Sequence, residues 1–190
     1  YGRGFWILDD LSPLRQLDDG VLATRAHLFE PRPAYRLLRR SLPGEPDRDG
    51  PHGYREDPPF GAPINYYLAD DAGPGGAARA PAGGRGGRGG DGAVTITITD
   101  SDGVEVNEFR DRGRAGINRA LWNMSWANPP GMPAGGRGFR GGGGGLPALP
   151  GTYTATVRAG SNEASSTFTL RGDPDVGLTM ADYQAQFEAA

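Results

Sequence analysis

Apolar and polar residues alternate strictly along residues 94–99. The valine and two isoleucines of this stretch fall on one face of an extended chain, and its three threonines fall on the other. Successive side chains of a strand point to opposite faces of a sheet, so this period of two predicts a strand with one buried face. The turn sequence Asp-Ser-Asp-Gly at 100–103 follows, and the chain returns as a second alternating strand through Phe109. Two strands alone are marginally stable, so the pattern predicts a hairpin packed on a second sheet.

The same criteria predict further strands, separated by turn signals and by no helical pattern. These strands lie at residues 63–68, 94–99, 104–109, 117–124, 151–158 and 163–170. Such a series predicts an all-β fold, an antiparallel sandwich of two sheets. We expect Trp122, Tyr153 and Phe168 to form its aromatic core.

The two ends of the chain carry different signals. Residues 5–8 (Phe-Trp-Ile-Leu) form a continuous apolar run, which is typical of a strand buried on both faces. Ser12 before Pro13 predicts a short helical turn with Ser12 as its N-cap. Near the other end, Thr179 and Asp182 have the spacing of a capping box and predict the start of a helix.

Glycine and proline divide the rest of the chain. The sequence holds 33 Gly and 17 Pro among 190 residues, which approaches a low-complexity composition. We therefore predict long Gly/Arg-rich loops within the sandwich and a Pro-rich linker before it. The expected organisation is 1–19 as the end of a preceding unit, 20–62 as linker with one short strand, 63–170 as the sandwich with loops 70–92 and 125–150, and 171–190 as linker and helix start.

The amino-acid composition argues against several classes of function. The net charge of −3 provides no global attraction for nucleic acid or an anionic membrane, and the lack of cysteine removes thiolate chemistry. No apolar run reaches the roughly 18 residues of a spanning helix. The chain begins with Tyr1 and stops within a helical pattern, so we expect it to be a fragment.

Catalytic and metal-binding motifs are weak. Asp9 and Asp10 are adjacent, and neighbours on a strand point to opposite faces, so they do not naturally flank one glycosidic bond. Residues 100–103 resemble the opening of a calcium loop but lack the glutamate at position 12, which favours a hairpin turn. His27 and His52 have no partners at ligand spacing. We predict no catalytic residue, metal or cofactor in this segment.

Arginine and glycine in the loops raise the alternative of RNA binding. Arg85 and Arg88 lie in the first loop, and Arg137, Phe139 and Arg140 lie in the second. Arg-Gly segments bind single strands through phosphate contacts and stacking. If the strands alternate in direction, however, the loops lie at opposite ends of the sandwich, roughly 20 to 26 Å apart. The sequence therefore argues against one continuous nucleic-acid surface.

Tyr66 and Tyr67 are the candidate ligand-binding residues. Because neighbours on a strand point to opposite faces, one of them should belong to the core and the other can offer a flat ring for sugar stacking. A half-buried structural tyrosine is the alternative.

The order of several segments resembles a known family. The segments GRGFWILDDLSPLRQ, LFEPRPAYR, GAPINYYL, TITITDSDG, AGINRALWNM, PGTYTATVRAG and ADYQAQFE are similar to the C-terminal region of bacterial sortilin-like β-propeller proteins with BNR repeats, commonly labelled glycosyl hydrolases. Residues 93–124 also resemble the Ig-like sandwich of flagellar hook-capping proteins. The resemblance implies that the first residues complete a propeller blade and that 63–170 form an Ig-like accessory domain. The Asp-box pattern of the repeats is absent, so no catalytic residue carries over.

The residue patterns predict a non-catalytic structural domain, and the resemblance implies that it belongs to a larger secreted or cell-envelope protein. Its expected partners are the upstream propeller and the downstream helical segment of the same chain. The alternatives are a carbohydrate-binding module and, with less support, an RNA-binding segment.

Overall fold

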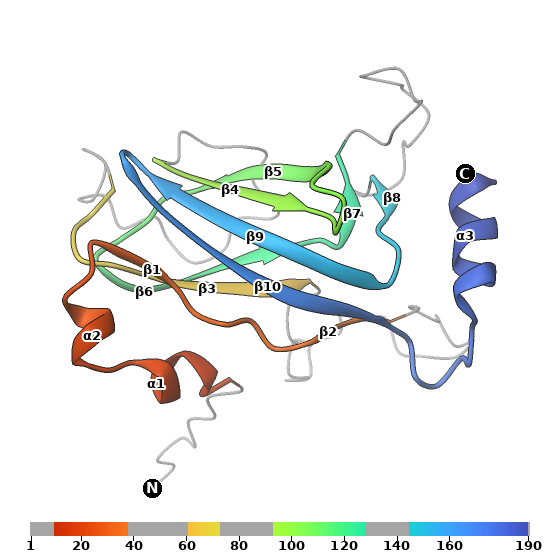
Figure 1. Cartoon of the computed structure of the whole chain (residues 1–190), viewed down its shortest axis with the longest axis horizontal. Coiled ribbons are helices and arrows are strands. Elements are labelled where there is room, and N and C mark those ends of the chain that lie inside the picture. Colours follow the sequence, from red (N-terminus) through yellow and green to blue (C-terminus); the bar gives the residue numbers. More distant parts are fainter. Residues whose placement is uncertain (1–9, 38–60, 73–92, 128–144, 190) are drawn as a thin grey trace, which may run out of the picture.

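Two β-sheets packed around one apolar core form the body of the protein (Figure 1). The structure is a computed structural model, and it describes residues 10–37, 61–72, 93–127 and 145–189. The elements in chain order are α1 (Ser12–Gln16), α2 (Asp19–Leu22), β1 (Ala26–Leu28), β2 (Ala34–Arg36), β3 (Ala62–Leu68), β4 (Val94–Thr99), β5 (Glu105–Asp111), β6 (Gly116–Trp122), β7 (Ser125–Trp126), β8 (Leu146–Pro147), β9 (Gly151–Ala159), β10 (Asn162–Gly172) and α3 (Met180–Glu188).

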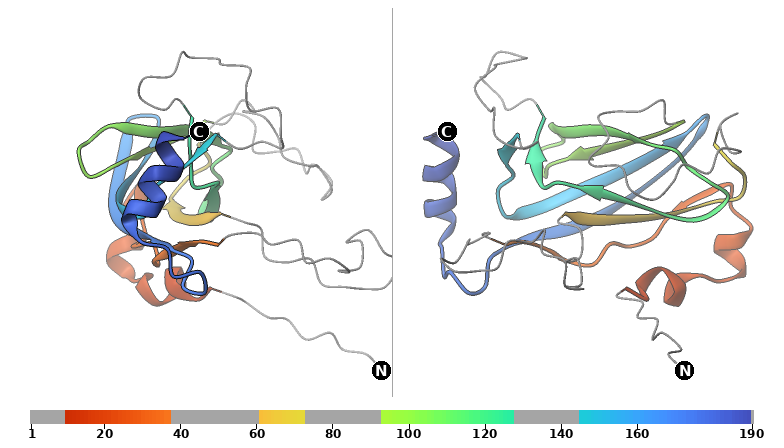
Figure 2. Two further views of the ribbon diagram at one scale, coloured as in Figure 1. Left: turned by 90° about the vertical axis from the view of Figure 1, so that its right-hand side faces the viewer. Right: turned by 180° about the vertical axis from the view of Figure 1, so that it is seen from behind.

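The strands form a five-stranded sheet, a three-stranded sheet and a small two-stranded sheet. The five-stranded sheet has the order β2-β10-β9-β4-β5, the three-stranded sheet has the order β1-β3-β6, and β7 pairs with β8. Figure 2 shows the two larger sheets as separate layers. The predicted all-β fold with two sheets is confirmed. The six predicted strands pair with one another in antiparallel fashion. The short edge strand β2, which lies in the predicted linker, runs parallel to β10.

The hairpin predicted from the alternating pattern is present. Strands β4 and β5 pair in antiparallel fashion, with a shift of register between Ile98 and Thr99. The Oδ1 atom of Asp100 accepts the backbone N–H groups of Asp102 and Val104, at 3.0 and 2.9 Å. Gly103 has a φ of +77°, a conformation that favours glycine. The segment 100–103 is therefore a turn stabilised by an aspartate side chain.

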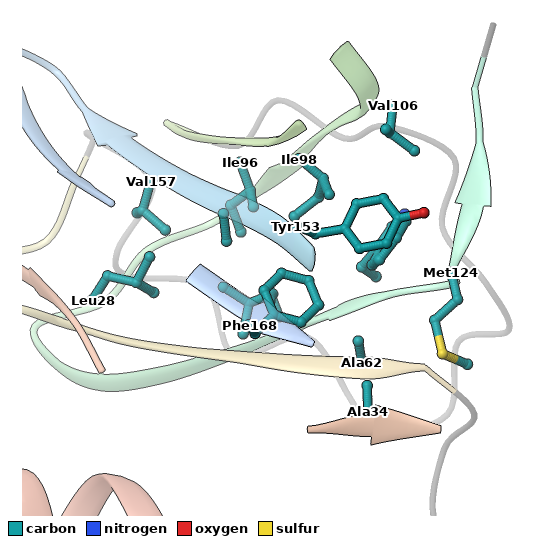
Figure 3. Close-up of a cluster of buried hydrophobic side chains, with 14 of the residues drawn as sticks. Leu28, Ala34, Ala62, Ile96, Ile98, Val106, Met124, Tyr153, Val157 and Phe168 are labelled. Atoms are coloured by element: carbon teal, nitrogen blue, oxygen red, sulfur yellow. The ribbon is translucent and has the colours of Figure 1, made fainter. Parts of the chain in front are cut away.

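The core contains the predicted aromatic cluster (Figure 3). The ring centres of Trp122 and Tyr153 lie 5.1 Å apart, and Phe168 lies 6.0 Å from Trp122 and 6.1 Å from Tyr153. Tyr153 and Phe168 point into the same space from β9 and β10. The indole N–H of Trp122 donates to the Ser125 carbonyl at 3.1 Å. This bond satisfies the polar atom that burial of the ring removes from water.

The sandwich uses more of the chain than the sequence pattern indicates. The predicted linker 20–62 supplies β1, which pairs with β3, and β2, which pairs with β10. The predicted loop 125–150 supplies β7 and β8 at its two ends. Each of these strands has only two or three residues. A stretch that short cannot display a period of two, so its strand character depends on the partner strand.

The two predicted helix starts differ in outcome. Helix α1 has Leu11 at its N-cap position, and the Ser12 side chain does not cap it. The Ser12 N–H donates to Oδ1 of Asp10 at 3.0 Å. The prediction of Ser12 as N-cap is therefore wrong. The capping box of α3 is confirmed, with Thr179 and Asp182 bonded reciprocally. The predicted strand at residues 5–8 lies outside the described residues.

Candidate functional site

The N-terminal end of the described chain is fixed by a clamp around Asp10. Its side chain is only 8% exposed. Besides the Ser12 amide, it accepts a hydrogen bond from Nδ2 of Asn65 at 3.3 Å and one from Nη2 of Arg119 at 3.4 Å. Nη1 of Arg32 lies 3.9 Å from Oδ1. Asn65 and Arg119 are cross-strand partners on β3 and β6, so Asp10 lies over the outer face of the three-stranded sheet.

The charges around Asp10 keep it ionised. Burial by itself raises the pKa of this carboxyl group, but the hydrogen bonds from Ser12 and the positive charges of Arg119 and Arg32 outweigh burial and hold its pKa below the ordinary value. A glycosidase general acid requires a raised pKa. The environment of Asp10 instead lowers the pKa of its carboxyl group. The site therefore supports a structural role for Asp10, while Asp9 lies outside the described residues.

A second contact network fixes helix α3 at the other end of the chain. Tyr183 is 2% exposed, and its hydroxyl accepts the backbone N–H of Asp173 at 3.1 Å. The guanidinium of Arg36 lies 5.0 Å from the centre of the Tyr183 ring, within the range of a cation–π contact. Gly172 leaves room for this ring, because a Cβ atom there would lie 2.5 Å from the Tyr183 hydroxyl oxygen.

Arg36 and two aromatic residues extend the contact between α3 and the sandwich. Nη1 of Arg36 donates to the Ala148 carbonyl at 3.3 Å, and its Nη2 donates to the Gln186 side chain at 3.4 Å. One helical turn after Tyr183, Phe187 packs edge-on against Trp126 with ring centres 6.0 Å apart. Helix α3 is thus held by residues from β2 and β7, and Arg36 also links β2 to the segment after β8.

The two candidate tyrosines of β3 face opposite sides, as predicted. Tyr66 is fully buried, and its hydroxyl donates to Oδ2 of Asp111 at 2.6 Å. Burial and this hydrogen bond raise the pKa of Tyr66 well above its usual range. Tyr66 is therefore the tyrosine of the pair that belongs to the core, and its ring has no surface exposed to a sugar. Tyr67 is half-buried on the outer face, where it pairs with His27 and Ile117.

A hollow at one end of the sandwich was not evident from the sequence. It has a volume of about 440 Å³. Arg25 and Asp70 form an ion pair of 2.7 Å at its rim, with both side chains about three-quarters exposed. Its lining residues are Arg25, Leu68, Asp70, Asp71, Ala72, Ala159, Gly160, Ser161 and Asn162. None of these has an aromatic ring, so the hollow offers polar groups without a stacking surface.

The Gly/Arg-rich loops start and end at opposite ends of the sandwich, as predicted. The strand that follows the first loop begins at Val94, opposite Ala159 at the end of β9. The second loop is flanked by β7 and β8, and Ala148 bonds to Met124 shortly before β9 begins. Strand β9 has nine residues, which at about 3.3 Å each separate the two loop bases by about 30 Å. The arginines themselves lie outside the described residues.

The described ranges also bear on metal binding and membrane spanning. No group of three or more His, Cys, Asp or Glu side chains is placed there to hold a metal ion. His27 packs edge-on against Phe29 with ring centres 5.1 Å apart, and His52 is outside these ranges. No helix in the described part of the chain is long and apolar enough to cross a membrane.

Comparisons with known proteins assign this chain to no family. A scan against protein-family models gives no match, and a search of curated proteins gives no significant match. The resemblance to sortilin-like propeller proteins therefore remains a prediction from the residues that carry it.

Proposed function

We propose that this chain is a non-catalytic structural domain that holds neighbouring segments of a larger protein in a fixed orientation. The observation that carries the proposal is the pair of networks at Asp10 and Tyr183. Each of them joins a flanking segment to strands that are distant in sequence, through groups that are largely buried. Contacts of this kind make a flanking segment part of the rigid body of the domain.

The finer assignment rests on the sequence. We assign the sandwich to the Ig-like class, as an accessory domain of a secreted or cell-envelope sortilin-like propeller protein. The buried Trp122 between two facing sheets supports this class, because a core tryptophan between the layers is a feature of Ig domains. In this assignment the preceding propeller adjoins Asp10, and the downstream helical segment begins with α3.

Backbone dynamics test the proposal. We expect NMR order parameters of residues 10–16 and 180–188 to match those of β9 and β10, near 0.85, because the two networks anchor these segments. Substituting Arg36→Ala should lower the values for 180–188 and leave those for β9 unchanged. Order parameters below about 0.6 in both flanking segments of the unmodified chain would contradict the proposal.

A carbohydrate-binding module is the alternative that one observation favours. Tyr67 is half-buried on the outer face of the three-stranded sheet, where an accessible ring can stack on a sugar. We expect oligosaccharide titrations to leave the Tyr67 ring resonances unchanged. A saturable shift that disappears in Tyr67→Ala would favour the carbohydrate module over the structural domain.

A further inference from the structure

Strand β6 is the long open edge of the three-stranded sheet. It stands at one end of the order β1-β3-β6 and pairs with β3 along all seven of its residues. The other sheet edges in the described part of the chain are short or protected. Strands β1, β2, β7 and β8 have two or three residues each, and β5 carries exposed charges at Glu105, Glu108 and Arg110. The Val106 carbonyl of β5 also accepts the Ala127 amide at 2.8 Å. A long edge without such protection is a template for pairing with another strand.

The hydrogen bonds of the neighbouring strands show which backbone groups of β6 face the open side. The Phe29 N–H donates to the Asn65 carbonyl at 3.1 Å, so the odd-numbered residues of β3 bond towards β1. Successive residues of a strand bond alternately to its two sides, so the even-numbered residues of β3 bond to β6. Their cross-strand partners in β6 also have even numbers. The N–H and C=O groups of Ile117 and Arg119 therefore point away from β3, and no strand in the described ranges pairs with them on that side.

The charge pattern of β6 determines how two such edges can face each other. Arg119 is the one charged side chain of this strand, and its Nη2 lies 3.4 Å from the Asp10 carboxylate. An antiparallel pair with its two-fold axis at Arg119 would place two arginines opposite each other, which is destabilising. With the axis at Asn118, Ile117 of each copy lies opposite Arg119 of the other. The side chain of Ile117, which is 41% exposed, then packs on the aliphatic stem of that arginine.

We propose that β6 is a self-association site, at which a second copy of this chain adds its own β6 in antiparallel orientation about Asn118. The two three-stranded sheets then form one continuous sheet in the order β1-β3-β6-β6-β3-β1. Each Ile117–Arg119 pair contributes two backbone hydrogen bonds, because both residues direct their N–H and C=O groups to the open edge. The inference goes beyond the proposed structural role, which does not depend on it. An edge contact buries little surface, so we expect a weak dimer with a Kd of about 100 μM.

Sedimentation of the full 190-residue chain tests the inference. Between about 5 and about 500 μM, we expect the apparent mass to rise from that of one chain towards that of two. Ile117→Lys should weaken association about tenfold, because each lysine then lies opposite the arginine of the other copy. The matched variant is Ile117→Glu, which should strengthen association about threefold, because each glutamate lies opposite that arginine. A general effect of charge at this exposed position would act equally in both variants.

Amide hydrogen exchange of the unmodified chain provides a second measurement. The amides of Ile117 and Arg119 should exchange about fivefold more slowly at the highest concentration than at the lowest. Those of Asn118 and Ala120, which bond to β3, are the internal control and should not change. Protection of Ile117 and Arg119 at the lowest concentration would overturn the inference, because another segment of the chain would then cover the edge. An apparent mass of one chain at every concentration, or equal effects of the Lys and Glu variants, would also overturn it.

Discussion

The guanidinium of Arg36 lies 5.0 Å from the centre of the Tyr183 ring, although the two residues come from opposite ends of the chain. Arg36 ends the short edge strand β2, and Tyr183 lies on the first turns of α3. The same arginine bonds to the Ala148 carbonyl and to Gln186. One side chain thus connects the parallel edge of the large sheet, the segment after β8 and the C-terminal helix.

Tyr183→Ala is expected to release α3 from the sandwich. The change removes a buried aromatic ring, its contact with Arg36 and the acceptor for the Asp173 amide. Aromatic-to-alanine changes at buried sites cost about 3 to 5 kcal/mol. Because α3 packs outside the two sheets (Figure 1), we expect the lost stability to appear as fast hydrogen exchange of residues 180–188, with β9 still protected. The control is Met180→Ala, on the same helix at an exposed position. Equal effects of the two changes would contradict the role of Tyr183.

Gly172→Ala is expected to displace Tyr183 without removing it. A Cβ atom at residue 172 would lie 2.5 Å from the Tyr183 hydroxyl oxygen and 2.9 Å from its Cε2 atom. Gly151→Ala is the control, since the nearest atom to its added Cβ would be 3.9 Å away. Thermal unfolding should show a lower melting temperature for Gly172→Ala and an unchanged one for Gly151→Ala. In the Tyr183→Ala background the same glycine change should have almost no further effect, because the clash is gone. An undiminished effect in that background would contradict this explanation.

Asp10→Asn is expected to reduce stability at neutral pH and to flatten its dependence on pH. The folded-state pKa of Asp10 is held below the ordinary value, so the ionised group stabilises the fold above the unfolded-state pKa of about 3.9. This contribution is lost as the pH falls through the folded-state pKa. The loss at pH 7 should be about 1 to 3 kcal/mol, because Asn cannot match the charge-assisted contacts. Denaturant unfolding of both proteins between pH 3 and 7 measures this difference in the free energy of unfolding.

Asp70→Asn is the control for Asp10→Asn. Asp70 pairs with Arg25 at 2.7 Å, but both side chains are about three-quarters exposed. Exposed ion pairs contribute little to stability, so this change should leave the unfolding curve almost unaltered at every pH. Similar pH profiles of stability for the two variants would show that burial of Asp10 does not cause the loss of stability in Asp10→Asn.

Trp122→Ala is expected to destabilise the whole sandwich. The ring is fully buried, contacts Tyr153 and Phe168, and donates a hydrogen bond to Ser125. We expect a loss of about 3 to 5 kcal/mol in the free energy of unfolding. Val104→Ala, at an exposed position, should cost less than about 0.5 kcal/mol. Circular dichroism during urea unfolding would compare the two variants, and a small loss for Trp122→Ala would contradict a single shared core.

The long strands were predictable because their pattern is complete within each segment. Along β4, Val94, Ile96 and Ile98 repeat with a period of two, and all three are fully buried. The capping box of α3 was predictable for the same reason, since Thr179 and Asp182 are only three residues apart. The turn at 100–103 also carries its own signal, because its aspartate and glycine act on neighbouring backbone groups.

The short strands and both anchoring networks were not predictable in this way. Strands β1 and β2 have three residues each, and their hydrogen-bond partners lie in β3 and β10. Nothing in the sequence around Asp10 indicates Asn65 or Arg119, and nothing around Tyr183 indicates Arg36. The sequence could divide Tyr66 and Tyr67 between two faces, but only the packing of the sheets decided which of them is buried.

The sequence by itself determined which segments become long strands, where the chain turns and where the last helix begins. These features depend on backbone geometry and on side chains within a few residues of each other, and such information is local. The tertiary structure decided which strands pair, that one edge runs parallel, and that the flanking segments join the domain through Asp10 and Tyr183. Those outcomes depend on contacts between residues far apart in the chain, which form only when the sheets close around their common core.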